Sequence, residues 1–159
     1  MSKEEVKMIQ KIIYNSKLLA IIISKRFSKP GIHFFTEEDL SQQLAYMKHP
    51  TGKIIQAHIH NSVSRKVNDI SEVLFIKNGR LRVDFYSDKQ KYLESRILEA
   101  GDVILLLQGG HGFEVLEDLE MFEVKQGPYY EDLDKIHFDL SLPKDLNFGT
   151  KTWKQLLFL

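Results

Sequence analysis

The sequence predicts an all-β protein, and three observations lead to this prediction. Short runs rich in β-branched and aromatic residues recur along the chain, as they do in strands. The nine glycines lie mostly between these runs, where tight turns are expected, and only four prolines are present. Helical periodicity is weak through the middle of the chain. With 159 residues, 43% of them hydrophobic, the chain is expected to form a single domain over residues 1–159.

The apolar run at residues 18–24 (LLAIIIS) is the first strand that we expect. The segment before it is either the other half of a hairpin that turns at Asn15 and Ser16, or a short helix that carries Val6, Ile9 and Ile13. The later strands are expected in the runs IIQAHIH, SEVLFIKNGRLRVDFYS, LESRILEAGDVILLL, HGFEVLED and MFEVKQG.

Asn78 and Gly79 give the clearest local signal, because an Asn-Gly pair between two apolar alternations is typical of a two-residue hairpin turn. The register that this turn sets places six residues on one face, namely Glu72, Leu74, Ile76, Leu81, Val83 and Phe85. Glu72 is then the only charge on an apolar face. The opposite face is expected to be solvated, and it carries Lys77, Arg80, Arg82, Asp84 and Tyr86. The alternative for that face is a subunit interface built on Phe75, Arg82 and Tyr86.

The charges of the chain balance, with 22 basic and 22 acidic residues and a sequence pI near 7.0. This composition provides no general attraction to nucleic acid or to an anionic membrane. The N-terminus does not read as a signal peptide, and the longest apolar run, residues 18–23, is too short to span a bilayer. We therefore expect a cytoplasmic protein whose partner is a small molecule or a protein, and neither nucleic acid nor membrane.

Three residues at the start of this β region have the chemistry of metal ligands. The chain has no cysteine, so histidine, aspartate and glutamate are the ligands available to a metal. His58 and His60 follow the two-residue period of a strand and point to the same side, with Cβ atoms about 7 Å apart. An ionised Glu72 on an apolar face needs a cation, an arginine or a proton to be tolerable, and a divalent metal is one such cation. His111, which follows a Gly-Gly pair, is the fourth candidate.

These residues resemble the two motifs of the cupin superfamily. The first motif corresponds to Gly52, five residues, His58-Ile59-His60, Glu72, six residues and Gly79. Its one departure is the stretch between His60 and Glu72, which has eleven residues where the family usually has three or four. In the second motif, GDVILLLQGGHGF, a leucine stands where proline is usual and His111 comes one residue early. The resemblance covers about residues 40–128.

The resemblance implies a double-stranded β-helix, which is a jelly-roll barrel, with short N- and C-terminal extensions. It also implies one divalent transition metal per chain, Fe, Mn, Ni or Zn, held by His58, His60, Glu72 and His111. Such a protein is expected to be an enzyme that acts on a small polar metabolite or sugar derivative, by isomerisation or oxygen-dependent oxidation. Two alternatives remain: a non-catalytic cupin that serves as sensor or carrier, and a metal-free cupin similar to the sugar-nucleotide epimerases, which use a histidine base.

The sequence identifies no general acid or base. Tyr46, His49, Glu114 and Tyr129 are possible proton carriers, and each is expected to be an ordinary surface or packing residue. A homodimer is expected, because the apolar strand at 18–24 and the apolar tail at 153–159 exceed what one small barrel can cover.

Overall fold

The protein is described here by a computed structural model, in which residues 8–130 and 134–139 are described. This part of the chain forms strands joined by turns and loops. The strands are β1 (Ile9–Tyr14), β2 (Lys17–Ile23), β3 (Gly31–Phe34), β4 (Ala45–Lys48), β5 (Glu72–Tyr86), β6 (Tyr92–Glu99), β7 (Val103–Leu106) and β8 (Gly110–Lys125). The all-β prediction is confirmed. Within the described ranges, we find no helix with the length and apolar character needed to cross a membrane.

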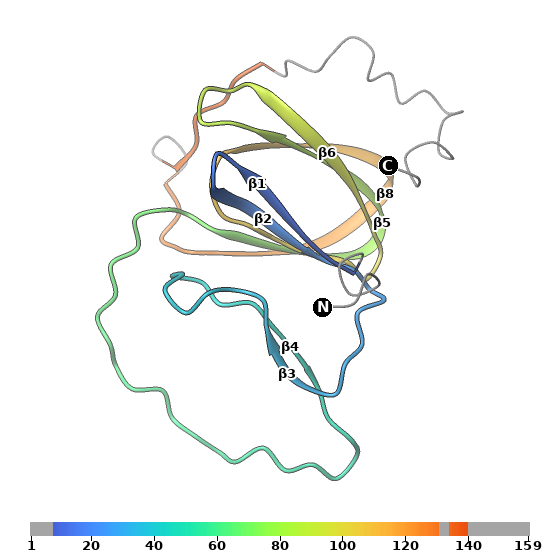
Figure 1. The fold of residues 1–159 in the computed structure, drawn as a ribbon, viewed down its shortest axis with the longest axis vertical. Coiled ribbons are helices and arrows are strands. Elements are labelled where there is room, and N and C mark those ends of the chain that lie inside the picture. The colour runs from blue at the N-terminus through green and yellow to red at the C-terminus, as the bar shows by residue number, and fades with distance from the viewer. Residues whose placement is uncertain (1–7, 131–133, 140–159) are drawn as a thin grey trace.

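Six strands form one antiparallel sheet that curls into a half-barrel (Figure 1). Its strand order is β1-β2-β7-β5-β6, and β8 pairs with β5 as well. A separate hairpin of β3 and β4 packs on the convex side against a second apolar cluster around Ile21, Phe27 and Leu105. The half-barrel is the architecture that these strands establish, and the finer jelly-roll description stays a prediction.

The N-terminal hairpin follows the first of the two alternatives. Asn15 and Ser16 have φ of 48° and 62°, and positive φ at both turn positions is what a tight two-residue hairpin requires. The strand predicted at 18–24 is confirmed as β2, which lies between β1 and β7 with residues 19–23 buried. The single chain therefore covers this apolar run, so the run does not support the expected homodimer, which stays a prediction. The tail at 153–159 lies outside the described residues.

The prediction of a hairpin turn at Asn78 and Gly79 is wrong. β5 continues through these residues as one strand, because β8 pairs with it along its whole length and supplies backbone partners on both sides of the Asn-Gly pair. The pairing shifts register between Ile76 and Leu81, and these bulges reverse the alternation of side chains. Leu74 and Ile76 therefore still share one buried cluster with Leu81, Val83 and Phe85, as predicted, although Glu72 lies opposite Leu106 and Lys125 instead of Phe85.

The face of β5 that was expected to be solvated is largely buried. Arg82 and Asp84 are 3% and 1% exposed, and the guanidinium donates two hydrogen bonds to the carboxylate, at 2.9 and 3.0 Å. The Ser95 hydroxyl donates a third to Asp84 at 2.5 Å. A bidentate pair with such support satisfies its charges internally, so this polar face tolerates burial. Tyr86 is buried as well, so only Phe75 of the three residues of the suggested interface is exposed.

The prediction of a strand at IIQAHIH is also wrong. Residues 51–70, which we call the arm, contain no strand and are all exposed. They form a wide arc from β4 to β5 that stands away from the half-barrel (Figure 1). A strand needs a neighbour for its backbone groups, and in the described part of the chain no strand pairs with the arm.

We predict that Gly79→Ala destabilises the fold far more than Gly52→Ala. Both glycines have positive φ, at +84° and +82°, so both substitutions carry a backbone cost of about 1–3 kcal/mol. A Cβ at Gly79 would also lie 2.0 Å from the carbonyl oxygen of Asp118 on β8, whereas a Cβ at Gly52 meets nothing within 4 Å. Urea unfolding of the two variants measures the difference, and equal losses would contradict the close approach of β5 and β8 at Gly79.

Candidate functional site

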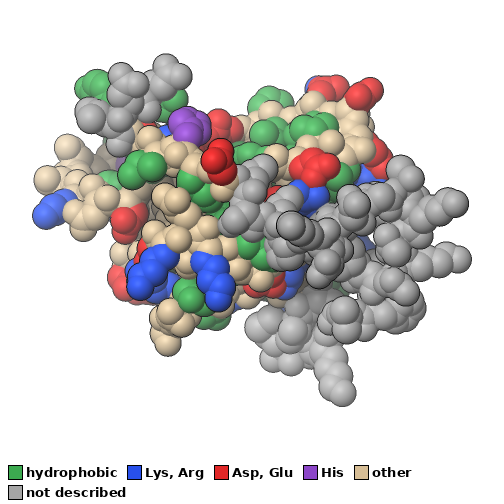
Figure 2. All heavy atoms as spheres, turned by 90° about the horizontal axis from the view of Figure 1, so that it is seen from above, with side chains coloured by type: hydrophobic (Ala, Val, Ile, Leu, Met, Phe, Trp, Pro, Cys, Tyr) green, Lys and Arg blue, Asp and Glu red, His purple; other side chains and the backbone are tan. Residues whose placement is uncertain are grey.

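A cleft of about 840 Å³ opens at one end of the half-barrel. Its walls come from the last residues of the arm, the start of β5, the β7–β8 connection with the start of β8, and residues 134–138. Its charged and aromatic lining includes Glu72, Asp88, His111, Phe113, Lys125 and Lys135. Figure 2 shows acidic, basic and apolar side chains interleaved on the described part of the face seen from above, in keeping with the balanced composition.

Glu72 and His111 are in direct contact in this cleft. Glu72 begins β5 and pairs with the end of β8, whereas His111 lies near the start of β8 and pairs with the end of β5. The two residues are therefore at opposite ends of the same strand pair, and they meet only because the sheet curls. His111 Nε2 lies 3.2 Å from Glu72 Oε2, within hydrogen-bond reach, and Glu72 is buried while His111 is partly exposed to the cleft.

The surroundings of Glu72 favour its ionised form. The hydrogen bond from His111 is the largest cause that holds the pKa of Glu72 below its ordinary value of 4.5. Burial acts in the opposite direction, and attraction to His111, Lys135 and Lys125 adds to the lowering. Lys135 Nζ lies 3.9 Å from Glu72 Oε1. Side chains of the chain itself therefore supply positive charge beside Glu72, so the carboxylate does not depend on a metal for the cation that it was expected to need.

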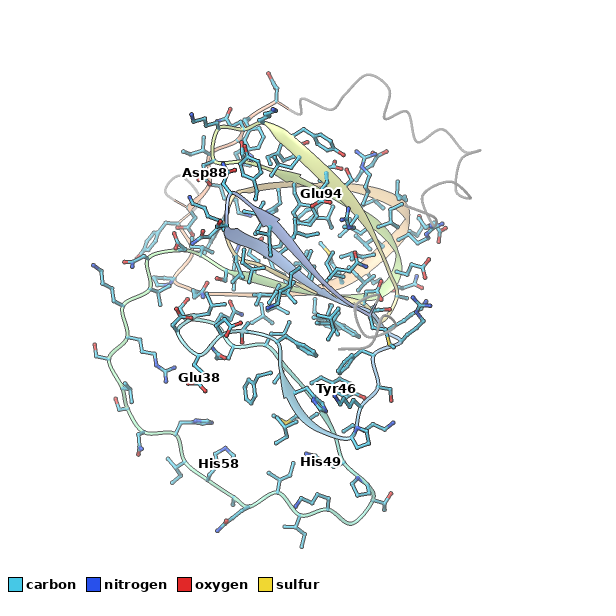
Figure 3. The ribbon with its side chains drawn as sticks, in the orientation of Figure 1. Glu38, Tyr46, His49, His58, Asp88 and Glu94 are labelled. Carbon is cyan, nitrogen blue, oxygen red and sulfur yellow. The ribbon has the colours of Figure 1, made fainter. Side chains whose placement is uncertain are left out.

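His58 and His60 lie on the arm, away from this pair. Their rings are close to one another, with centroids 5.1 Å apart. Figure 3 places His58 on the arc at the far end of the view from Asp88, which lines the cleft. The structure thus brings the four predicted ligands together as two separate pairs. Over residues 8–130 and 134–139 no three His, Asp or Glu side chains are grouped so that they could hold a metal, and the four-ligand centre stays a prediction.

The possible proton carriers named from the sequence do not line the cleft. Tyr46 packs against Phe27 with ring centroids 5.0 Å apart, and Glu114 pairs with Arg82. Tyr129 lies under the ammonium of Lys125 at 4.4 Å. Sequence reasoning did not connect Lys125 or Lys135 with Glu72: the position of Lys125 follows only once β8 is known to pair with β5, and no local pattern marks Lys135.

Comparison with known proteins adds no family to this description, because no protein-family model, curated protein or solved structure matches the chain. The resemblance to cupins therefore stays a prediction, and the functional argument rests on the geometry of the cleft.

We predict that the Glu72 carboxylate makes the stability of the protein depend on pH in the acid range. Because its pKa is lowered on folding, its contribution is fully present above the ordinary carboxyl value of 4.5 and is lost as the pH falls through the lower, folded value. Urea unfolding at several pH values from about 7 to about 3 should show a steeper acid loss for the wild type than for Glu72→Gln.

Glu38→Gln is the control for this experiment, because Glu38 is an exposed carboxylate on the β3–β4 connection. Its acid profile should follow the wild type. Parallel profiles for the wild type and Glu72→Gln would show that the contact with His111 does not form in solution.

Proposed function

We propose that the protein binds a small polar molecule in this cleft and acts on it by acid–base chemistry, with His111 as the proton carrier. The observation that carries the proposal is the contact between the His111 imidazole and the buried Glu72 carboxylate in the cleft. The proposed reaction class is proton removal next to a carbonyl, as in isomerisation or epimerisation of a sugar derivative.

The roles of the two residues follow from their hydrogen bond. The Nε2–H of His111 donates a hydrogen bond to the Glu72 carboxylate and keeps its proton, which leaves Nδ1 as the nitrogen that takes a proton from the substrate. The carboxylate also orients the ring and stabilises the imidazolium that forms, as in other histidine–carboxylate pairs. A carboxylate ionised at neutral pH is suited to this role, and the lowered pKa of Glu72 agrees with it.

The rest of the cleft supports a small, polar and partly anionic ligand. Lys125 and Lys135 line it and can bind a carboxylate or phosphate, or stabilise negative charge that develops on a carbonyl oxygen. Phe113 lies beside His111 with ring centroids 5.2 Å apart and offers an apolar wall. The volume of about 840 Å³ falls within the usual range of small-molecule sites, which is about 300–1,000 Å³.

We predict that the wild type exchanges the proton next to the carbonyl of its substrate with solvent. A panel of hexose phosphates and sugar nucleotides is incubated with the protein in D₂O, and deuterium incorporation is read by NMR. His111→Gln should slow the exchange by about 100-fold or more, which is the usual contribution of a general base. His33→Gln is the control, because His33 lies on β3 outside the cleft. Exchange that persists in His111→Gln would contradict the assignment, and binding without exchange would favour the carrier or sensor alternative.

A metal centre in a cupin-like jelly roll is the second candidate function. Two observations favour it: Glu72 and His111 offer two converging ligand atoms in the cleft, and the rings of His58 and His60 form a second pair on the arm. The two pairs together would hold one divalent Fe, Mn, Ni or Zn ion in an arrangement in which the arm, with His58 and His60, lies against the cleft that contains Glu72 and His111. When bound, the metal would supply a Lewis acid for isomerisation or, as iron, a site for oxygen.

We predict that, if this second candidate is right, protein purified without added metal carries about one equivalent of transition metal per chain. Elemental analysis measures the content, and His60→Ala should lose most of it. His33→Ala serves as the control, since His33 is not one of the four ligands. Full occupancy in His60→Ala would exclude this ligand set. If metal-free wild type still exchanges substrate protons, the acid–base proposal is supported and the metal candidate is contradicted.

A further inference from the structure

β8 is an open edge of the half-barrel. It is sixteen residues long, and within the described residues it pairs only with β5, so no strand lies along its other side. The backbone groups on that side form a template for another strand. An open edge of this length is a liability that proteins usually cover.

The side chains of β8 are uncovered as well. Phe113 and Val115 are 39% and 58% exposed, although their partners across β5, Val83 and Leu81, are fully buried. The apolar concave face of the sheet therefore continues onto β8 without cover. On the other face of β8, Phe122 and Val124 are also exposed. An open strand edge with exposed apolar side chains on both faces of the strand is a docking surface.

The arm has a complementary property, because it carries many apolar side chains that are all exposed. Its twenty residues, 51–70, are all exposed. Six of them are branched aliphatic residues, namely Ile54, Ile55, Ile59, Val63, Val67 and Ile70. Its first part, KIIQAHIH, is rich in isoleucine and has the alternation of a strand. Such a segment gains backbone partners and apolar cover if it adds to a sheet edge.

We infer that the arm of one copy docks along the free edge of β8 of a second copy, and that the exchange is reciprocal. A two-fold dimer satisfies both surfaces at once, because every chain contributes one arm and one edge. The charges of the two segments agree with this pairing. The arm carries three basic residues and one acidic residue, and β8 carries five acidic residues and one lysine. Within one chain the arm passes its own half-barrel without pairing, so the second copy is the occupant that the structure favours.

The exchange would place residues of one copy at the cleft of the other. His58 and His60 lie on one face of an extended arm, and His111 and Phe113 lie on one face of β8. A strand added beside β8 with this face inward brings the two imidazoles next to the second copy's His111 and Glu72. In antiparallel pairing, the register that sets His60 opposite His111 sets Gln56 opposite Val115. The docking does not depend on the proposed chemistry; only its consequence for metal rests on the metal-binding candidate.

The absence of cysteine from the chain allows a direct test by cross-linking. Gln56→Cys is placed in a chain with one affinity tag and Val115→Cys in a chain with another, and the two are mixed and treated with a short bismaleimide. We predict a product that carries both tags. Glu38→Cys with Val115→Cys is the matched control, since Glu38 is exposed but lies outside the arm, and it should give little product. Equal yields from the two mixtures would overturn the inference.

A second measurement separates exchange from docking within one chain. Light scattering should give the wild type a mass of twice 18.6 kDa, and the double variant Ile54→Lys and Ile59→Lys a mass of 18.6 kDa. The two side chains are 85% and 94% exposed, so their replacement leaves the half-barrel core intact. Wild type of 18.6 kDa, or a double variant that stays dimeric, would overturn the inference.

Metal content distinguishes this inference from the metal-binding candidate. A dimer that cross-links through the arm but carries no metal supports the exchange and counts against the metal centre. A monomer that binds one equivalent of metal overturns the exchange and leaves the metal centre standing.

Discussion

The fold depends on the way β5 keeps its apolar side chains on one side while it bends. β5 touches β6 and β7 along one edge and β8 along the other, so it is the strand through which most of the sheet is connected. A regular strand with this sequence would send Leu74 and Ile76 to one face and Leu81 and Val83 to the other. The bulges around Gly79 remove that conflict, and both halves of β5 then contribute to one core.

The candidate site is a product of the same bend. Glu72 and His111 stand at opposite ends of the β5–β8 pair, and a flat sheet would hold them far apart. Curvature brings them into contact, and the lysines near Glu72 keep the buried carboxylate tolerable without any bound ion. The chemistry proposed for the cleft therefore depends on residues that never touch a ligand, chiefly those that allow β5 to bend.

The sequence was informative where the structure is local. The turn at Asn15 and Ser16 joins strands that are adjacent in the chain, so the residues that decide the hairpin lie within one short segment. The Asn-Gly pair at 78 and 79 carries an equally strong local signal for a hairpin. The chain nevertheless continues there as one strand, because β8, which is farther away in the sequence, pairs with it. Burial of Arg82 was missed for a similar reason, because the partners that satisfy it include Asp84 and Glu114 on two strands. The sequence placed Glu72 and His111 in one site, and the structure has them in contact. The strand expected at His58 and His60 is absent, because no described strand pairs with that segment.

The strand order also constrains how the chain can fold during synthesis. Among the described strands, β2 and β5 are joined in the sheet only through β7, which is made after both of them, and β8 follows β7 in the chain. Until Val103–Leu106 has left the ribosome, the N-terminal hairpin and β5 have no common partner, and their apolar faces stay unpaired. Contacts between such distant segments form slowly, and unpaired edges favour aggregation in the meantime. A chain that ends before β8 would also lack one half of the Glu72–His111 contact, so the nascent protein acquires its cleft only when the described fold is nearly complete.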